Sequence, residues 1–452
     1  MDATTARLVD FASRSEFARL SADTVHECKR RLIDTFACAV GAYDEPLCQM
    51  ARAVAKRQQP SPDTPAARVW GCDWQTTPDA AAFANGVMLR FLDISDMYRV
   101  KSGGHPSDVM AGILAVGEAT RADGASVLNA ITLAYDVYCS FCETIDINSR
   151  GWDQPVYGIL ASVLGAGKLL RLSREQMGNA IALALAPNMA LNQTRHGDLS
   201  GWKGCAGANA SRNAVFAAFL ARDGFTGPTA VFEGKGGLWD IVGRFDWDMD
   251  VAPHRVTRTD IKSFPVCYHA QAAIWAALDV RKRLRVEDIV GVQVETYRFA
   301  ADFLAGDPRR WAPATRETAD HSMPYVVAIA LLDGEVTALS FADVRLTDPI
   351  VLNLMRKVSV KESPDLSDRY PESSSCRLRA CTSDGKEAVA EVRYPKGHIN
   401  NPMDDAELTA KFRSMFRAYG NEAQCQFVLD GLWNFERASD IGEVIAFFAR
   451  HS

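Results

Sequence analysis

The chain has 452 residues, of which 48% are hydrophobic and 23% charged, the balance of an ordinary globular protein. Its net charge of −6 and the lack of a long Lys/Arg run exclude a nucleic-acid-binding protein. No uninterrupted apolar stretch approaches the roughly 18 residues of a membrane span, and the first residues lack a signal-peptide pattern. The eleven cysteines, an odd number scattered along the chain, are typical of reduced thiols, so we expect a cytoplasmic protein.

The first 260 residues are predicted to form one helix after another. From Ser21 to a stop at Gly41, apolar residues recur at helical spacing, and they are Val25, Leu32, Ile33, Phe36 and Val40. Ser173 and Gln176 have the spacing of a capping box at a helix start. Residues 126–145 are apolar almost all round, which predicts a central helix. Residues 204–224 are rich in alanine and glycine, so their helix must pack closely against its neighbours.

The pattern changes near residue 285. Val290, Val292, Val294 and Thr296 alternate with other residues at the period of a half-buried strand. Residues 376–394 are predicted to form two strands joined at Asp384-Gly385, and helical patterns return after Pro395. The predicted fold is mainly α, with a large all-helical domain at 1–267 and 398–452 and a smaller α+β domain at 268–397.

The segment "GGHPSD", residues 103–108, is the first candidate for chemistry. A predicted helix ends just before it and delivers Asp93 and Asp96, while Ser107 is the expected N-cap of the next helix. His105 would then lie close to a helix N-terminus, where amide N–H groups favour anions, and Arg99 adds positive charge. The alternative is a loop histidine with satisfied hydrogen bonds beside a solvated charge cluster.

Three further segments carry polar groups that could serve a site. Lys203 is expected in a glycine-flanked turn, and Lys262 and His269 bracket the expected domain junction, where ligands often bind. The pair Asp320–His321 precedes a buried helix and is predicted to be a cap and turn in preference to a catalytic dyad. Solvent-exposed structural roles remain the alternative for the lysines.

Several other chemistries have no support in the sequence. Cys139 and Cys142 form CxxC inside an apolar helix without a second pair, so we expect buried packing and no metal there. The chain contains no HExxH, Walker A or dinucleotide-binding pattern, and "GKGG" at 234–237 is predicted to be a turn. We therefore predict no metal and no cofactor.

Four segments in order resemble the MmgE/PrpD family, which includes 2-methylcitrate dehydratase, cis-aconitate decarboxylase and iminodisuccinate epimerase. They are "FLDISDMY" with "GGHPSD", "WKGCAGANASRNAVFAAFLARDGFTGP", "IKSFPVCYHAQAAIWAAL" and "DHSMPYVVAIALLDG". The resemblance implies a helical domain built from both chain ends, a smaller α+β lid domain, and a homodimer with its site between domains. It also places the family's catalytic residues on Asp93, His105, Lys203 and Lys262.

The sequence departs from the family at positions that bear on the reaction. The decarboxylases carry threonine where this chain has Met97 and glycine where it has Asp108, which weakens a decarboxylase assignment. A histidine that often follows "RG" is replaced by the residues Asp153 and Gln154.

The predicted function is a cofactor-independent hydro-lyase acting on a 2-methylcitrate-like di- or tricarboxylate. Such chemistry needs cationic clamps, a base for the proton beside a carboxylate, and an acid for the departing hydroxide. Lys203, Lys262 and Arg99 are the predicted clamps, and either Asp93, His105 or Lys262 is the base. The candidate substrate-binding residues are Arg99, Ser107, His269 and Tyr325. The alternatives are an epimerase of an iminodisuccinate-like acid, a cis-aconitate-type decarboxylase, and a non-catalytic binder of small carboxylates.

Overall fold

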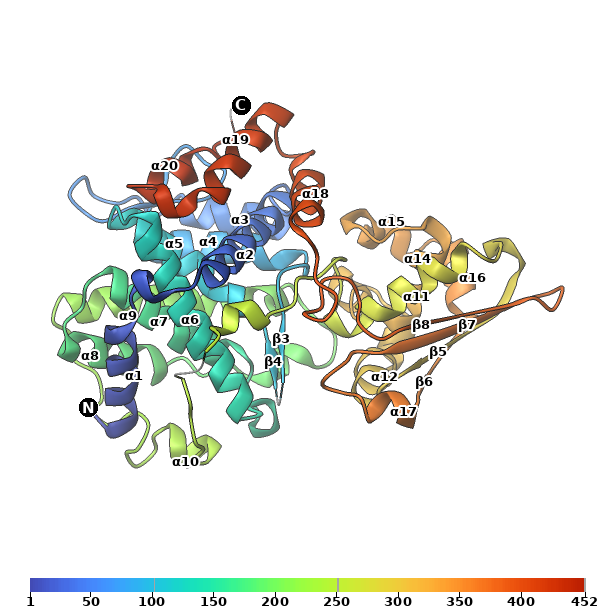
Figure 1. The fold of residues 1–452 in the computed structure, drawn as a ribbon, viewed down its shortest axis with the longest axis horizontal. Helices are drawn as coiled ribbons and strands as arrows, with labels where there is room; N and C mark the ends of the chain where they lie inside the picture. The colour runs from blue at the N-terminus through green and yellow to red at the C-terminus, as the bar shows by residue number, and fades with distance from the viewer. Residues whose placement is uncertain (101, 250–251, 451–452) are drawn as a thin grey trace. The chain divides into compact units, whose positions relative to one another are not determined.

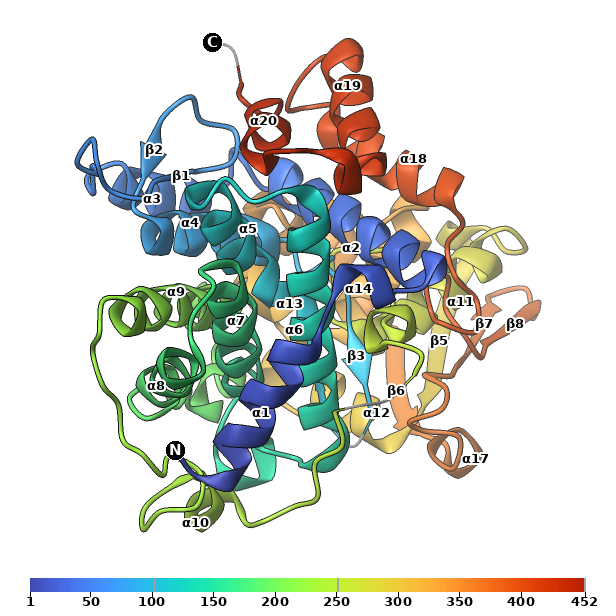
Figure 2. The same ribbon diagram turned by 60° about the vertical axis from the view of Figure 1, so that its left-hand side comes forward.

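The computed structural model describes residues 1–100, 102–249 and 252–450, and this part of the chain is mainly helical, as predicted (Figures 1 and 2). The chain folds into two compact units. The first consists of Met1–Arg195, Gly204–Thr259 and Asp404–Ser452, and the second of His196–Lys203 and Asp260–Met403.

The limits of the second unit differ from those of the predicted α+β domain because two connecting segments run side by side. Residues 260–267 contain no helix, and the Ile261 amide donates to the Gly397 carbonyl at 2.9 Å. The Ile399 amide in turn donates to the Asp260 carboxylate at 2.8 Å. These hydrogen bonds hold the two connections together. Both connections, and with them Lys262, belong to the second unit.

In the first unit, helices from the two ends of the chain pack together. Helix α2 (Ala22–Gly41) begins at Ser21, whose hydroxyl accepts a hydrogen bond from the Thr24 amide, and it ends at Gly41 as predicted. Its predicted apolar stripe is buried except for Val25, which is partly exposed. Helices α18 (Asp405–Phe416) and α19 (Glu422–Trp433), near the C-terminus, lie against α2 (Figure 1). The other C-terminal helix is α20 (Ile441–Ala446).

The centre of the first unit is a group of closely packed apolar helices. They are α4 (Pro78–Phe91), α5 (Met110–Ala119), α6 (Gly124–Thr144) and α7 (Pro155–Leu169), with α9 (Trp202–Arg222) beside α4 and α5. Around them lie α1 (Ala3–Arg14), α3 (Pro46–Ala55), α8 (Arg174–Leu185) and α10 (Leu238–Val242), and the predicted capping box starts α8. Cys139 and Cys142 are buried packing residues of α6, as predicted.

Of the helices in the described chain, only α6 is long and apolar enough to cross a membrane by length and composition. However, 89% of its apolar window is buried inside the protein. Such burial is the ordinary environment of a core helix.

The second unit contains a four-stranded sheet in the order β6-β5-β7-β8. Its strands are β5 (Ile289–Thr296), β6 (Val358–Glu362), β7 (Cys376–Thr382) and β8 (Glu387–Val392), and only β5 and β6 run parallel. Strands β7 and β8 form the predicted hairpin, in which Gly385 has a φ of +82°. That left-handed conformation favours glycine. Helices α11 (Gln271–Arg281) and α14 (Met323–Asp333) pack against the sheet (Figure 1).

One predicted feature of β5 is wrong. Val292, Val294 and Thr296 are buried as expected, but Val290 is 52% exposed. A register shift between Ile289 and Gly291 interrupts the pairing of β5 with β7. This bulge turns Val290 out of the alternation, which periodicity in the sequence does not reveal.

Short α-helices occupy the connections between the strands and the longer helices of the second unit. They are α12 (Arg298–Ala305), α13 (Arg316–Ala319), α15 (Asp343–Leu346), α16 (Pro349–Met355) and α17 (Pro364–Ser367).

Candidate active site

The loop after α4 holds Asp93 in an unusual backbone conformation. Its φ is +50°, a left-handed value that is uncommon for residues other than glycine, and its side chain is buried. The guanidinium of Arg90 lies 3.6 Å from the Asp93 carboxylate and donates to the Ser95 hydroxyl at 2.6 Å. Arg90 Nε also lies 3.0 Å from Asp108 Oδ1. One buried arginine therefore connects the loop that carries Asp93 to the turn that follows His105.

His105 is fixed at both its backbone and its ring. Its amide donates to the Tyr138 hydroxyl at 2.9 Å, and Nδ1 lies 2.7 Å from the backbone carbonyl of Asp96. Because a carbonyl oxygen can only accept, Nδ1 must carry the hydrogen. In the neutral imidazole, Nε2 then has the lone pair, and any proton that His105 accepts goes to Nε2.

Ser107 is not the N-cap of the following helix, so this prediction is wrong. Residues Pro106–Val109 form a 3-10 turn, and α5 begins only at Met110. The Ser107 amide instead donates to Asp96 Oδ1 at 3.1 Å, and the Tyr135 hydroxyl donates to Asp96 Oδ2 at 2.8 Å. Burial nevertheless raises the pKa of Asp96 above its usual value. Asp96 thus anchors the turn, since its carbonyl and carboxylate hold both His105 and Ser107.

Two further buried carboxylates lie in the first unit, and the sequence had not identified them as site residues. Burial raises the pKa of Asp108 to about 6, although Arg90 beside it acts in the opposite direction. Asp153 forms a bidentate ion pair with Arg195, whose Nε lies 3.0 Å from both carboxylate oxygens. The sequence did contain a signal that could have identified these two carboxylates, because Asp108 and Asp153 lie at positions where the chain departs from the family pattern.

In the second unit, Lys203 belongs to a buried triad with Asp320 and His321. Lys203 lies in the first turn of α9 and not in a loop, so the predicted turn is wrong. Its ammonium donates to both Asp320 oxygens at 2.9 Å, and His321 Nδ1 lies 2.5 Å from Asp320 Oδ1. The N-cap of α14 is Ser322, so the side chains of Asp320 and His321 face Lys203 and each other without capping that helix.

The other candidates of the second unit have different environments. Lys262 is buried and donates to the Val266 carbonyl at 3.2 Å. His269 Nδ1 makes a hydrogen bond with the hydroxyl of Tyr297, whose ring stacks on Tyr370 at 4.5 Å. Tyr325 is fully buried and donates to the Ser340 carbonyl at 2.7 Å, a contact within the core of the unit. Arg99, in the first unit, is partly exposed on the short strand β3 (Tyr98–Arg99).

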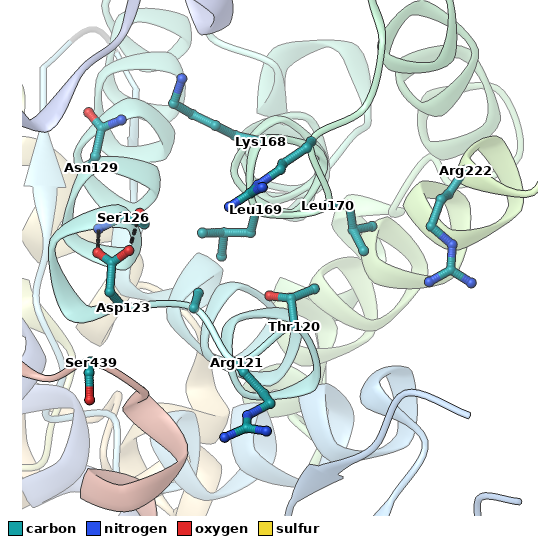
Figure 3. A pocket seen from close by; sticks show the side chains of 12 residues that line it. Thr120, Arg121, Asp123, Ser126, Asn129, Lys168, Leu169, Leu170, Arg222 and Ser439 are labelled. Carbon is teal, nitrogen blue, oxygen red and sulfur yellow. Dashed lines mark hydrogen bonds between the residues drawn. The ribbon is translucent and has the colours of Figure 1, made fainter. Parts of the chain in front are cut away.

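A cavity of about 590 Å³ lies apart from these residues, at the ends of α5 and α7 and the start of α6 (Figure 3). Arg121, Lys168 and Arg222 line it, and Asp123 caps α6 by accepting from the Ser126 amide (Figure 3). Cations are favourable at helix C-termini, where carbonyl groups remain unpaired, and this accounts for the basic lining. None of the predicted site residues lines this cavity.

Comparison with known proteins decides the family. Models of the MmgE/PrpD N-terminal domain and the MmgE/PrpD C-terminal domain match residues 6–249 and 264–434. The chain belongs to the MmgE/PrpD family.

Several relatives of this MmgE/PrpD chain are named dehydratases. It is 29% identical to a 2-methylcitrate dehydratase of Cupriavidus necator and 28% identical to one of Escherichia coli (strain K12). Each match covers 90% of this chain and 88% of the relative. An alkylcitrate dehydratase of a fungal species is 25% identical, over 90% of this chain and 87% of the relative. Agreement over most of the chain supports an enzyme of the lyase class, a hydro-lyase.

The two units of this MmgE/PrpD chain hold different polar groups. The first holds buried carboxylates and a histidine whose ring nitrogens are distinguished by a backbone carbonyl. The second holds two buried lysines, of which Lys203 is paired with Asp320 and Lys262 contacts a backbone carbonyl. Lysine ammonium groups are common hydrogen-bonding partners of carboxylates.

Proposed function

We propose that this chain is a cofactor-independent hydro-lyase that removes water from 2-methylcitrate or a closely similar alkylcitrate. The observation that carries the proposal is the fixed ring of His105. Its Nδ1 donates to the Asp96 carbonyl, which leaves Nε2 as the basic nitrogen of a neutral imidazole. A base of this kind suits removal of a proton beside a carboxylate near neutral pH.

In the proposed reaction, His105 takes the proton, and Asp93 positions either the imidazole or the substrate. We assign the base to His105 in preference to Asp93 because the Asp93 carboxylate is already paired with Arg90. Lys262 is assigned to carboxylate binding, together with Lys203.

An alkylcitrate carries three carboxylates, and the proposed clamps are Lys203, Lys262 and Arg99, with His269 as a further contact. The hydroxyl of Tyr325 is satisfied by the Ser340 carbonyl and the amide of Ser107 holds Asp96, so we give these two residues supporting roles. By resemblance to the family, we also propose that the second unit acts as a lid and that the enzyme is a cytoplasmic homodimer.

The test is incubation of the purified enzyme in D₂O with a panel of acids, followed by NMR. The panel contains 2-methylcitrate, citrate, cis-aconitate and an amino-dicarboxylate. We expect loss of water from 2-methylcitrate with formation of an alkene signal. Exchange of a proton without elimination would favour an epimerase, and release of CO₂ from cis-aconitate would favour a decarboxylase. No change in any acid, with saturable binding, would identify a carboxylate binder.

A further inference from the structure

Another buried histidine, His321, has a ring partner that differs from that of His105. His321 is 7% exposed, and its Nδ1 faces the carboxylate of Asp320 at 2.5 Å. A carboxylate beside one ring nitrogen stabilises the doubly protonated ring, as well as fixing the orientation of the imidazole. A backbone carbonyl, the partner of His105, has no full charge with which to do this.

We propose that His321 is the general acid of the reaction and that Asp320 is the positioning residue that orients its ring. This assignment rests on the proposed hydro-lyase function, which needs a proton donor for the departing hydroxide. Pairs of titratable groups in contrasting environments are the usual origin of separate acid and base roles in one enzyme. His105 and His321 form such a pair, with one neutral partner and one anionic partner.

Lys203 makes the triad suited to an anionic substrate. Its ammonium donates to both oxygens of Asp320 and lies 3.3 Å from His321 Nδ1. The ammonium is a like charge that opposes protonation of His321, whereas the carboxylates of a bound polycarboxylate favour it, so substrate binding and protonation of His321 support each other.

The reaction balances with these two histidines alone. Nε2 of His105 takes the proton from the carbon beside a carboxylate, and the electron pair of that C–H bond forms the carbon–carbon double bond. The C–O bond to the hydroxyl group breaks, and its oxygen takes the proton from Nε2 of His321, so that water leaves. His105 ends protonated and His321 neutral, and exchange with solvent restores both.

His254 offers a matched control, because it also pairs with a carboxylate. Its Nδ1 lies 2.6 Å from Asp136 Oδ2, but its side chain is 34% exposed, and none of the assigned residues takes part in this pair. Asp136 also accepts from the Arg255 amide, as expected for a structural cap. His254→Gln removes an Asp–His pair without touching the proposed chemistry.

The experiment compares deuterium exchange with elimination, using 2-methylcitrate in D₂O and the full-length enzyme. If His321 is the acid, His321→Gln should lower elimination by about 10²-fold, the usual scale for loss of an acid or base, while exchange at the abstracted position stays within a few-fold. The ratio of exchange to elimination therefore rises by one to two orders of magnitude. His254→Gln should leave both rates and their ratio unchanged.

A second substrate tests the role of the proton directly. An analogue with chloride in place of the departing hydroxyl group needs no protonation to leave, so His321→Gln should eliminate chloride at close to the parental rate. Asp320→Asn, which preserves volume, should show the same selectivity, and it replaces His321→Gln if that variant does not fold. The assignment of His321 would be overturned if proton exchange, loss of water and loss of chloride all fell by the same factor. It would also be overturned if none of these rates fell. Inactivity of the parent on every acid would instead overturn the proposed function.

Discussion

Gly104 should be essential to the site because two polar side chains occupy the space where a side chain would begin. A Cβ atom at Gly104 would lie 2.2 Å from the Tyr138 hydroxyl and 2.5 Å from Gln154 Oε1. The Tyr138 hydroxyl also accepts the hydrogen bond from the His105 amide. Gly104→Ala therefore forces apart the contacts that fix the position of His105.

The size of the Gly104→Ala effect on stability and turnover follows from these distances. Ordinary contacts begin near 3.4 Å, so Tyr138 or the backbone must move by about 1 Å. Overpacking of a well-packed site costs about 1–3 kcal/mol, and loss of the His105 amide hydrogen bond costs about 1 kcal/mol more. A displacement of about 1 Å at a catalytic group lowers turnover by about 10²-fold. We therefore expect a loss of stability of about 2–4 kcal/mol, and a hundredfold loss of activity in the protein that remains folded.

Gly103→Ala is the matched control for this prediction. Its Cβ would meet the end of the Met97 side chain at 2.8 Å, and a methionine side chain is flexible enough to move. Circular dichroism melting and turnover of 2-methylcitrate should be measured for both variants at a temperature where both remain folded. If Gly104→Ala retains turnover within a few-fold of Gly103→Ala, Tyr138 does not fix a catalytic His105.

Further predictions concern single groups of the site. His105→Gln should lower turnover of 2-methylcitrate by about 10²-fold with little change in KM, and a change of only a few-fold would mark His105 as a structural residue. Lys203→Ala and Lys262→Ala should raise KM as well as lower turnover, which steady-state kinetics would show. Folded Asp108 has a pKa of about 6, against 3.8 for an aspartate in water, so it binds its proton more tightly in the folded state. Relative to Asp108→Asn, the parent should therefore gain about 2 kcal/mol of stability as pH falls from about 7 to about 4, and parallel pH profiles of the urea midpoint would contradict this. Activity should survive treatment with a chelator, and loss that one divalent ion restores would require a metal-dependent mechanism.

The sequence predicted correctly those helices and strands whose limits depend only on nearby residues. Helix α2 ends at Gly41, and Ser173 caps α8, because caps and stops are encoded within a few residues. The bulge that exposes Val290 was missed because it depends on the pairing of β5 with β7, a strand that lies far along the sequence. The start of α9 was also missed, since the glycines beside Lys203 indicate a turn when read locally.

The sequence identified polar residues in the right segments but not their partners. His105 was selected from its flanking glycines and proline, whereas its carbonyl partner, which defines the tautomer, becomes evident only in three dimensions. Asp320 and His321 were interpreted as a cap and turn, because adjacent residues at a helix start usually have that role. Lys203, which pairs with Asp320, is 117 residues earlier in the chain. Ion pairs over such separations leave no local pattern.

The buried charges are themselves an argument for chemistry. In the described chain, Arg90, Asp108, Lys203 and Asp320 are each at most 4% exposed. Replacing a buried ion pair with apolar residues of similar volume is often neutral or stabilising, because desolvation offsets the attraction between the charges. Apolar helix packing and the covered sheet would thus hold both units together without these groups. Selection for stability alone does not account for such charges, whereas the proposed recognition of a polyanion and transfer of its proton would use them.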